Sequence, residues 1–372
     1  MTIQLSIPFL PDPAYMDFLA ARRAHIHSLY FSLFTTPGVD ARYRLGPWRR
    51  EQLLRYLPRL GDVPKYALIN SRFYHPEHYF DTVFQDRLLE RLEGLTTAGL
   101  LTGIVFTDFY LLNALGRRGP ATLGALEAVP SVNAHIDNPR KLRICLDTIA
   151  ESGFRRPQKI ILDRALNRRP EALAKLVATI HERYSPMAVG LLANEGCLPD
   201  CPFKPAHDAH LALGNMHLTR ENTYDLNVDL GCIKAFRTHP ERIFQSPFIR
   251  PEDVDRLAPA ISFVKLGGRT LGTAFLQRVI DAYILRRYPG NLLDLMDTLE
   301  ALAPVIHVAG EALPDDFYDR MCACPDNCRT CGYCRRLARK AVRQKPLQLP
   351  DWRQQPRLGC GCGHSPEGSL GI

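Results

Sequence analysis

The sequence predicts an α/β fold of the TIM-type (β/α)8 barrel class, followed by a C-terminal cysteine-rich extension. Stretches typical of strands and of helices alternate eight times before residue 290 of the 372-residue chain. Strands separated by helices pair in parallel through right-handed crossovers, and eight such units can close into a barrel. A doubly wound open sheet is the alternative. No glycine-rich phosphate loop follows the first strand, which disfavours a dinucleotide-binding domain.

The strands and helices are assigned from hydrophobic periodicity. Short apolar runs rich in β-branched residues favour strands, and longer amphipathic runs favour helices. The expected strands span residues 2–9, 25–34, 65–74, 101–111, 126–136, 159–167, 187–197 and 261–269. The expected helices span residues 13–24, 48–60, 84–100, 139–154, 170–184 and 273–288.

This alternation divides the chain into three regions. Residues 1–310 are expected to form the barrel. Residues 311–345 are expected to form a cysteine-rich segment with a basic helix that runs to about residue 344. Residues 346–372 are rich in Pro and Gly, which is typical of an irregular tail.

Composition and charge narrow the class of protein. Hydrophobic residues make up 46% of the chain, enough for a substantial core, and the net charge is +8. This mild excess permits an RNA or another anionic partner without requiring one. The N-terminus lacks a signal peptide, and no apolar run reaches the roughly 18 residues that cross a bilayer, so we expect a cytoplasmic protein with no membrane span. Thiols stay reduced in that compartment, which favours metal binding over disulfides for clustered cysteines.

A downstream cluster holds five of the eleven cysteines within 13 residues. Its members are Cys322, Cys324, Cys328, Cys331 and Cys334. From Cys324 onward the spacing is C-x3-C-x2-C-x2-C, and short loops of this kind wrap 4Fe–4S clusters. Zinc is the alternative for four cysteines, but its sites usually split into two pairs separated by a longer spacer. The spacing therefore favours a 4Fe–4S cluster held by Cys324, Cys328, Cys331 and Cys334.

A second group of cysteines follows the seventh expected strand. Cys197 and Cys201 lie four residues apart, and Cys232 follows in a later segment. Three ligands leave a fourth position to be filled. The candidates for this position are Cys322, Cys360, Cys362 and His207. Cys145 lies on the apolar side of an expected helix, which indicates a buried thiol of the core.

Polar residues stand at the carboxyl ends of six expected strands, where barrel enzymes place their chemistry. They are Asn70, Arg72, Thr107, Asp108, Asn133, His135, Asp163, Arg164, Asn194, Glu195, Lys265 and Arg269. As a set they are suited to an anionic organic acid, because Arg binds carboxylates through two hydrogen bonds. Taken singly, each fits an ordinary loop hydrogen bond or a helix N-cap equally well. We assign catalytic roles to Asp108, His135, Asp163, Glu195 and Arg269, and cofactor binding to Arg164 and Lys265.

Three stretches resemble the collagenase-like peptidase family, which includes proteins of anaerobic ubiquinone hydroxylation and of RNA hydroxylation. They are "NEGCLPDCPF" (194–203), the isolated Cys232, and "SPFIRPEDVDRLAPAISFVKLGGR" (246–269), whose Lys265 and Arg269 match the family's Lys and Arg. The resemblance implies a TIM-type barrel and a 4Fe–4S cluster bound by Cys197, Cys201 and Cys232. It further implies oxygen-independent hydroxylation or a related redox reaction.

The chain also departs from this family. Gly267–Gly268 stand where the family has the glutamate of its Glu-Gly-Arg. The family's fourth barrel cysteine, expected between Cys201 and Cys232, is missing, and Met216 and His217 lie in that interval. The downstream cluster is not typical of the better-known members, and it would supply the missing ligand or hold a second cluster for electron delivery.

Three functions follow as hypotheses. The first is an iron–sulfur enzyme that hydroxylates or oxidises a small molecule, such as a prenyl-quinone-like ring, or an RNA base, together with an electron donor or acceptor. The second is a non-catalytic iron–sulfur or zinc subunit that docks on a homologous barrel or on RNA. The third is a peptidase, for which the sequence offers no nucleophile motif and no zinc-hydrolase motif.

Overall fold

The computed structural model describes residues 2–33, 38–41, 49–119, 121–216 and 223–345. The tail expected at residues 346–372, with Cys360 and Cys362, lies outside the described residues. No helix of the described part has the length and apolar character needed to cross a membrane.

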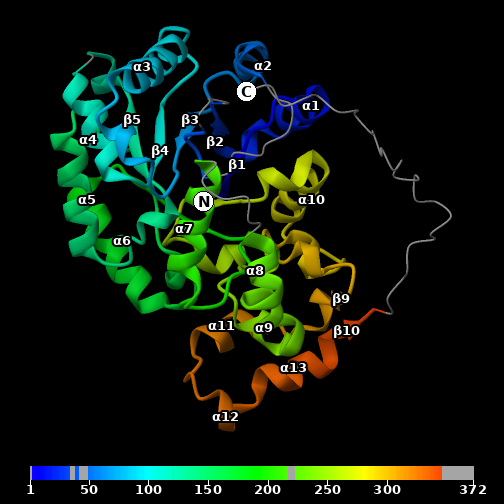
Figure 1. Ribbon diagram of the computed structural model, residues 1–372. Coiled ribbons are helices and arrows are strands. Elements are labelled where there is room, and N and C mark those ends of the chain that lie inside the picture. The colour runs from blue at the N-terminus through cyan, green and yellow to red at the C-terminus, as the bar shows by residue number, and fades with distance from the viewer. Residues whose placement is uncertain (1, 34–37, 42–48, 120, 217–222, 346–372) are drawn as a thin grey trace, which may run out of the picture.

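Eight parallel strands form a nearly closed barrel, as the sequence predicts (Figure 1). Their order around the sheet is β5-β4-β3-β2-β1-β8-β7-β6, so that β1 pairs with both β2 and β8. A backbone bridge between Glu127 and Arg155 lies at the remaining gap between β5 and β6. The strands are β1 (Gln4–Pro8), β2 (Ile26–Ser32), β3 (Lys65–Ile69), β4 (Gly103–Phe106), β5 (Glu127–Pro130), β6 (Lys159–Ile161), β7 (Ala188–Leu192) and β8 (Phe263–Lys265).

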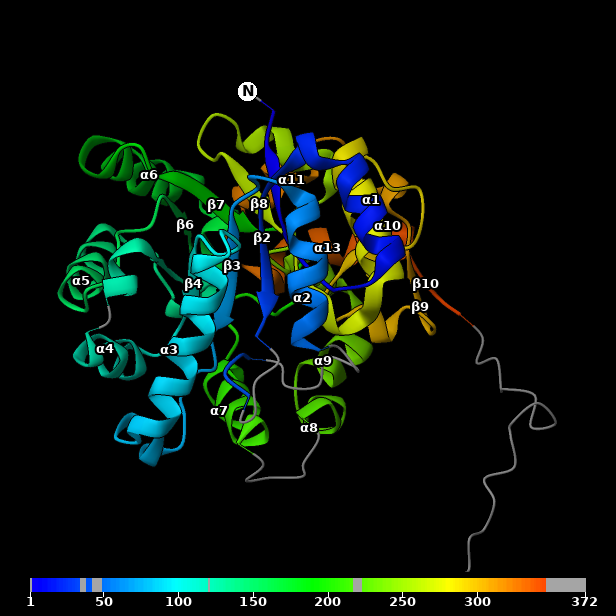
Figure 2. The ribbon, with the colours of Figure 1, turned by 90° about the horizontal axis from the view of Figure 1, so that it is seen from above.

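Helices between the strands form the outer layer of the barrel (Figures 1 and 2). They are α1 (Pro13–Ala21), α2 (Arg50–Tyr56), α3 (Thr82–Thr97), α4 (Phe109–Arg118), α5 (Pro139–Glu151), α6 (Pro170–Tyr184) and α10 (Gly272–Leu285). Side chains that accept hydrogen bonds from first-turn N–H groups cap four of them, α1, α3, α4 and α5. Such caps satisfy N–H groups that have no partner within the helix.

Several predicted strands end earlier than expected, and α4 is a helix that the periodicity analysis missed. The stretch 101–111 was expected to be one strand, but β4 ends at Phe106. Asp108 Oδ1 accepts hydrogen bonds from the N–H groups of Tyr110 and Leu111, at 2.8 and 3.3 Å, and thereby starts α4. Asp163 similarly starts a 3-10 turn after β6 by accepting the N–H of Ala165.

Three further helices lie between β7 and β8, where the sequence analysis placed only cysteines and loops. They are α7 (Lys204–Asn215), α8 (Thr223–Asp229) and α9 (Cys232–Thr238). Figure 2 shows this insertion beside the ends toward which the strands point. The insertion therefore covers the side of the barrel on which the polar strand ends meet.

The segment after the barrel packs against this insertion. It contains α11 (Phe317–Cys322), α12 (Cys328–Cys331) and α13 (Tyr333–Ala341). A 3-10 turn, η7 (Pro240–Gln245), packs against both α9 and α13. The basic helix was expected to reach residue 344 but ends at Ala341, because β10 (Val342–Gln344) pairs antiparallel with β9 (Ile306–Val308).

Alternate strand residues fill the barrel with two clusters that are separate from the main core. One contains Tyr30, Tyr66, Leu68, Val105 and Val129, and the other Val132, Ile161, Leu192 and Phe263. Buried Lys159 also lies here: its Nζ donates to Ser28 Oγ at 2.7 Å and lies 3.6 Å from the centroid of the Tyr66 ring. Burial, reinforced by the charge of Lys265, holds the pKa of Lys159 well below its usual value.

Gly190 tests how tightly the barrel interior is packed. A Cβ at this position would lie 2.2 Å from Cε2 of Phe263, whose ring is fully buried and stacks on His27 with centroids 4.2 Å apart. Because the ring has no free space to move into, we expect Gly190→Ala to lower the free energy of unfolding by about 1–3 kcal/mol. Urea denaturation measures this change. Gly124→Ala, where a Cβ meets nothing within 4 Å, is the control, and equal losses in both variants would contradict the packing argument.

Candidate functional site

Arg164 is the centre of a buried charge network at the carboxyl ends of the strands. It follows β6, and its Nη1 forms a 2.6 Å ion pair with Glu195 Oε2, which follows β7. Its Nη2 donates to Asn133 Oδ1 after β5 at 3.0 Å. The side chains of Arg164 and Glu195 are only 9% and 17% exposed. Three neighbouring strand ends are therefore joined through one guanidinium group.

Helix α7 extends this network to β3. Lys204 Nζ contacts both carboxylate oxygens of Asp208, at 2.6 and 2.7 Å, and Asn133 Oδ1 at 3.2 Å. Arg72, which follows β3, donates to Asp208 Oδ1 at 3.0 Å. Burial alone would raise the pKa of Asp208, but the charges of Arg72 and Lys204 hold it below its usual value.

Lys265 ends β8 and faces the same region. The residue is 7% exposed, and its Nζ lies 4.6 Å from the centroid of the Tyr30 ring. Burial, followed by the charge of Arg269, lowers the pKa of Lys265 to about 7, against the opposing charge of Glu195. The side chain of Arg269 is 9% exposed and forms a 3.0 Å ion pair with Asp40. Lys265 therefore carries an amine that is partly neutral near pH 7.

Other predicted site residues have structural contacts. Asp108 caps α4 and accepts a hydrogen bond from the Tyr79 hydroxyl. His135 Nδ1 lies 2.7 Å from Asp163 Oδ2, at the rim next to the Arg164 network. Asn194 Nδ2 donates to the Gly267 carbonyl, and Asn194 Oδ1 accepts the Gly267 N–H. This side chain therefore joins the ends of β7 and β8.

Two more of the polar residues at strand ends form hydrogen bonds with backbone groups. Asn70 Oδ1 accepts the N–H of Ala41 at 3.0 Å. The Thr107 hydroxyl donates to the Asn70 carbonyl at 3.3 Å. Each polar residue, taken singly, fits a loop hydrogen bond or a helix N-cap. The structure shows such a contact for Asn70, Thr107, Asp108 and Asn194. A catalytic role for Asp108, His135, Asp163, Glu195 or Arg269 stays a prediction.

The upstream cysteines lie beside the charge network. Cys197 Sγ is 3.9 Å from Arg164 Nη1, and burial, then the charge of Glu195, raises the pKa of Cys197 well above its usual value. Burial, then the charge of Cys201, raises the pKa of Cys232, and Cys201 also adds to the raised pKa of Cys197, so Cys197 and Cys232 both lie within electrostatic range of Cys201.

Cys232 Sγ also lies 3.5 Å from Asn227 Oδ1. Asn227 lines a pocket of about 130 Å³ together with His207, one of the candidates for a fourth ligand. Another candidate, Cys322, ends α11, where it forms a hydrogen bond with Tyr318 and lies within electrostatic range of Arg168 from the turn after β6.

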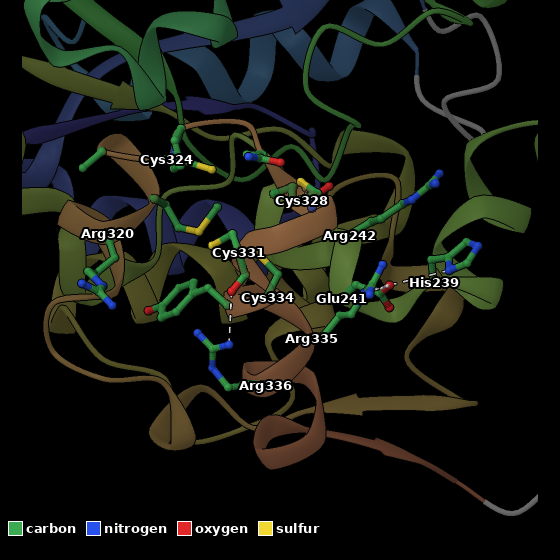
Figure 3. Close-up of a pocket in the computed structure, with 17 residues that line it drawn as sticks. His239, Glu241, Arg242, Arg320, Cys324, Cys328, Cys331, Cys334, Arg335 and Arg336 are labelled. Carbon is green, nitrogen blue, oxygen red and sulfur yellow. Dashed lines mark hydrogen bonds and ion pairs between the residues drawn. The ribbon is translucent and has the colours of Figure 1, made fainter.

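The downstream cysteines line a pocket of about 520 Å³ between η7, α12 and α13 (Figure 3). Its four cysteines are Cys324, Cys328, Cys331 and Cys334. Burial, then the charges of the other three thiols, raises the pKa of Cys334 to about 11. Gln245 Nε2 donates to Cys328 Sγ at 3.5 Å. Arg242, Arg320, Arg335 and Arg336 line the same pocket and favour a negatively charged occupant.

The donor set of this pocket fits an iron–sulfur cluster. All nine cysteines of the described residues are free thiols. In the described part of the chain, no three Cys, His, Asp or Glu side chains surround one point closely enough to hold a single metal ion. Thiolates that share one zinc ion lie close together, since each Zn–S bond is about 2.3 Å long, whereas a cubane binds its thiolates through different iron atoms. Four thiols that line one pocket are donors of the kind that an iron–sulfur cluster takes, and zinc stays the alternative.

Sequence reasoning missed Lys204, Asp208 and Asp40. The first two lie four residues apart on α7, and this spacing is typical of an ion pair on a helix. The helical pattern of residues 204–215 is the signal that indicates this pair. Asp40 offered no signal, because its partner Arg269 is 229 residues away.

Comparisons with known proteins agree with the sequence motifs. No family model matches the chain. Uncharacterized protease MJ1657 of Methanocaldococcus jannaschii is 31% identical over 187 residues, which cover 50% of this chain and 54% of the relative. Over the matched half, this chain is similar in sequence to that protease. The match spans about half the length of this curated relative.

A solved structure, titled "The Structure of the U32 Peptidase Mk0906", is also similar to this chain. It is 16% identical, covers 72% of this chain and 94% of its own, and has a TM-score of 0.46.

Replacing Lys265 by Met tests its buried amine. The native pKa of about 7 lies below the ordinary 10.5, so the unfolded chain binds more protons than the folded chain between these pH values. The stability of the wild type therefore rises with pH across this window and is lowest below pH 7. We expect Lys265→Met to be more stable than the wild type by roughly 2–5 kcal/mol below pH 7, with a difference that shrinks toward pH 10.

Urea denaturation at several pH values between these limits measures the difference. Lys175→Met on α6, where the side chain is exposed, is the control and is expected to show no such trend. A constant difference between wild type and Lys265→Met would show that the amine keeps its ordinary pKa.

Replacing Asp208 by Ala tests the connection between α7 and the barrel. The variant leaves Arg72 and Lys204 largely buried without their shared carboxylate, and we expect the free energy of unfolding to fall by about 2–4 kcal/mol. Asp147→Ala removes an exposed ion pair with Arg143 and should change it by less than about 1 kcal/mol. Chemical denaturation of both variants gives the comparison, and similar small effects would mean that the network adds little stability.

Proposed function

We propose that this chain is an iron–sulfur enzyme that oxidises an anionic substrate without O2 at the open end of its barrel, with hydroxylation of a small molecule or an RNA base as the reaction. The observation that carries the proposal is the pocket formed by Cys324, Cys328, Cys331 and Cys334. The upstream thiols near the Arg164 network support a second cluster, bound by Cys197, Cys201 and Cys232. The resemblance of its motifs to a family that includes oxygen-independent hydroxylation proteins is consistent with both.

A bound 4Fe–4S cluster supplies one-electron transfer. With water as the oxygen source, hydroxylation replaces a C–H bond by a C–O bond and releases two electrons and two protons. The chain must therefore bind the substrate, accept protons and pass electrons onward. Each of these tasks has candidate groups among the described residues.

Substrate binding falls to the cations at the strand ends. Arg72, Arg164, Lys204 and Arg269 lie there, and four carboxylates, Asp40, Asp163, Glu195 and Asp208, balance their charge. Protonated Lys265 would add one positive charge to this balanced set. Guanidinium and ammonium groups bind a carboxylate or phosphate group of a substrate.

Proton transfer falls to Lys265 Nζ. Its pKa of about 7 leaves a substantial neutral fraction at pH 7, and a base with a pKa near the working pH is effective in general-base catalysis. Glu195 contributes electrostatically to Lys265 and holds Arg164 in place. His135, paired with Asp163, offers a second proton acceptor at the rim.

Two other functions are weighed against this one. A non-catalytic iron–sulfur or zinc subunit would have the same cysteines but would not need a buried amine of lowered pKa among cations. The name of the M. jannaschii relative, an uncharacterized protease, suggests a peptidase. A fluorogenic gelatin assay tests it directly.

Metal analysis tests the proposal. We expect full-length protein purified without oxygen to contain about eight iron and eight sulfide ions if both groups are loaded, and to give an EPR signal on reduction. Cys328→Ser with Cys331→Ser should remove about half of the iron, and Cys201→Ser with Cys232→Ser the other half.

Cys145→Ala is the matched control, because this thiol is buried in the core on α5 and should leave the iron content unchanged. A colourless protein with stoichiometric zinc contradicts the proposal. Mass spectrometry of small molecules and RNA incubated with the iron-loaded protein then seeks a product that has gained one oxygen atom.

A further inference from the structure

Residues 320–345, which hold the downstream cysteines, are strongly basic, although four carboxylates (Glu311, Asp315, Asp316 and Asp319) precede them in the chain. Residues 320–345 contain eight Lys and Arg residues and one Asp, a net charge of +7, whereas the whole chain has +8. The rest of the chain, more than nine-tenths of it by length, is thus close to neutral. Such a concentration of one sign creates a strong local field that attracts a partner of the opposite sign.

The basic side chains point outward around the cysteine pocket. On α13, Leu337 and Ala341 are buried, whereas Arg335, Arg336, Arg339 and Lys340 are exposed. Figure 3 shows Arg320, Arg335 and Arg336 beside the labelled cysteines. The exposed face of α12 and α13, defined here as the basic face, therefore surrounds the thiols and is open to solvent.

The downstream thiols are the more accessible of the two cysteine groups. Cys328 and Cys331 are exposed, whereas Cys197 is only partly accessible and lies against buried Arg164. A short piece of chain connects the two groups, because α9 begins at Cys232 and leads into η7, whose Gln245 donates to Cys328. The downstream site thus has one side toward the barrel and the other toward solvent.

We propose that the basic face docks a small acidic electron-transfer protein of the iron–sulfur or flavin class, which takes electrons from the four-cysteine site. The inference rests on the proposed function, in which oxidation of the substrate releases two electrons. Each docking event moves one electron: the site is oxidised, the partner is reduced, and no bond or proton is exchanged. Two events complete one turnover.

Two observations favour an acidic redox protein over RNA. Redox partners form small, weak interfaces guided by charge, and a basic face around accessible thiols suits such an encounter. Single-stranded RNA is usually held by aromatic side chains on which its bases stack. Among the described residues, none of the exposed large apolar or aromatic side chains falls within 320–345.

The test measures binding of the full-length, anaerobically purified protein to an acidic plant-type [2Fe–2S] ferredoxin as the probe, by biolayer interferometry at low and high salt. We expect binding that weakens as salt rises. Arg339→Glu with Lys340→Glu reverses two exposed charges on the basic face and should weaken binding at least about tenfold. Lys175→Glu with Arg183→Glu reverses two exposed charges on α6 and should change it less than about twofold.

Iron content, measured on the same samples, separates the two proposals. Iron-loaded protein that does not bind the ferredoxin, or that loses binding equally in both variants, overturns the docking proposal and leaves the proposed function standing. A protein without iron overturns the proposed function and, with it, the electron transfer.

Tighter binding of a single-stranded RNA, lost in the Arg339→Glu/Lys340→Glu variant, would assign the basic face to RNA instead. Oxidation of the reduced protein by ferredoxin, followed by absorbance, is the expected second result.

Discussion

Charges buried at the strand ends need partners of opposite sign, and this requirement organises the candidate site. An unpaired charge inside a protein costs several kcal/mol, so each buried cation must lie near a carboxylate or lose its proton. Arg164 meets this requirement through Glu195, and Arg72 does so through Asp208 on α7. Because Asp208 comes from the insertion between β7 and β8, the barrel and the insertion depend on each other. The same ion pairs fix the positions of the upstream cysteines, because Cys197 and Cys201 precede α7 and Cys232 begins α9.

Lys265 meets the same requirement differently. It lies among Arg269, Arg164 and Arg72, and the nearby Glu195 does not outweigh burial and these charges. The amine therefore gives up its proton near pH 7 rather than being neutralised by a carboxylate. An anionic ligand would reverse this balance, because its charge would raise the pKa of Lys265 again. Substrate binding and the protonation of Lys265 are thus linked in physical terms: each anion bound favours the uptake of a proton.

The sequence predicted the features that depend on local pattern and missed those that depend on distant contacts. All eight strands were located, because buried parallel strands are short apolar runs. Their ends were less accurate, since Asp108 and Asp163 redirect the backbone by capping, which periodicity does not register. The polar strand ends were found as a set, but the pair of Arg72 with Asp208 joins residues 136 positions apart. No local pattern indicates such a pair.

The two groups of cysteines also differ in how far their spacing in the sequence predicts their positions in the structure. Cys324 to Cys334 lie within one short segment, so their spacing alone predicted that they would line a common pocket. Cys232 approaches Cys201 only because α7 and α8 fold back between them, a result that spacing does not contain. Burial, hydrogen bonds to sulfur and nearby charge set the potential of an iron–sulfur cluster, and the two groups differ in all three. Cys197 lies against an arginine at the charge network, whereas Cys328 lies near solvent and accepts a hydrogen bond from Gln245. Two clusters in these surroundings would have different potentials, which is the condition for electrons to move from the barrel toward the surface.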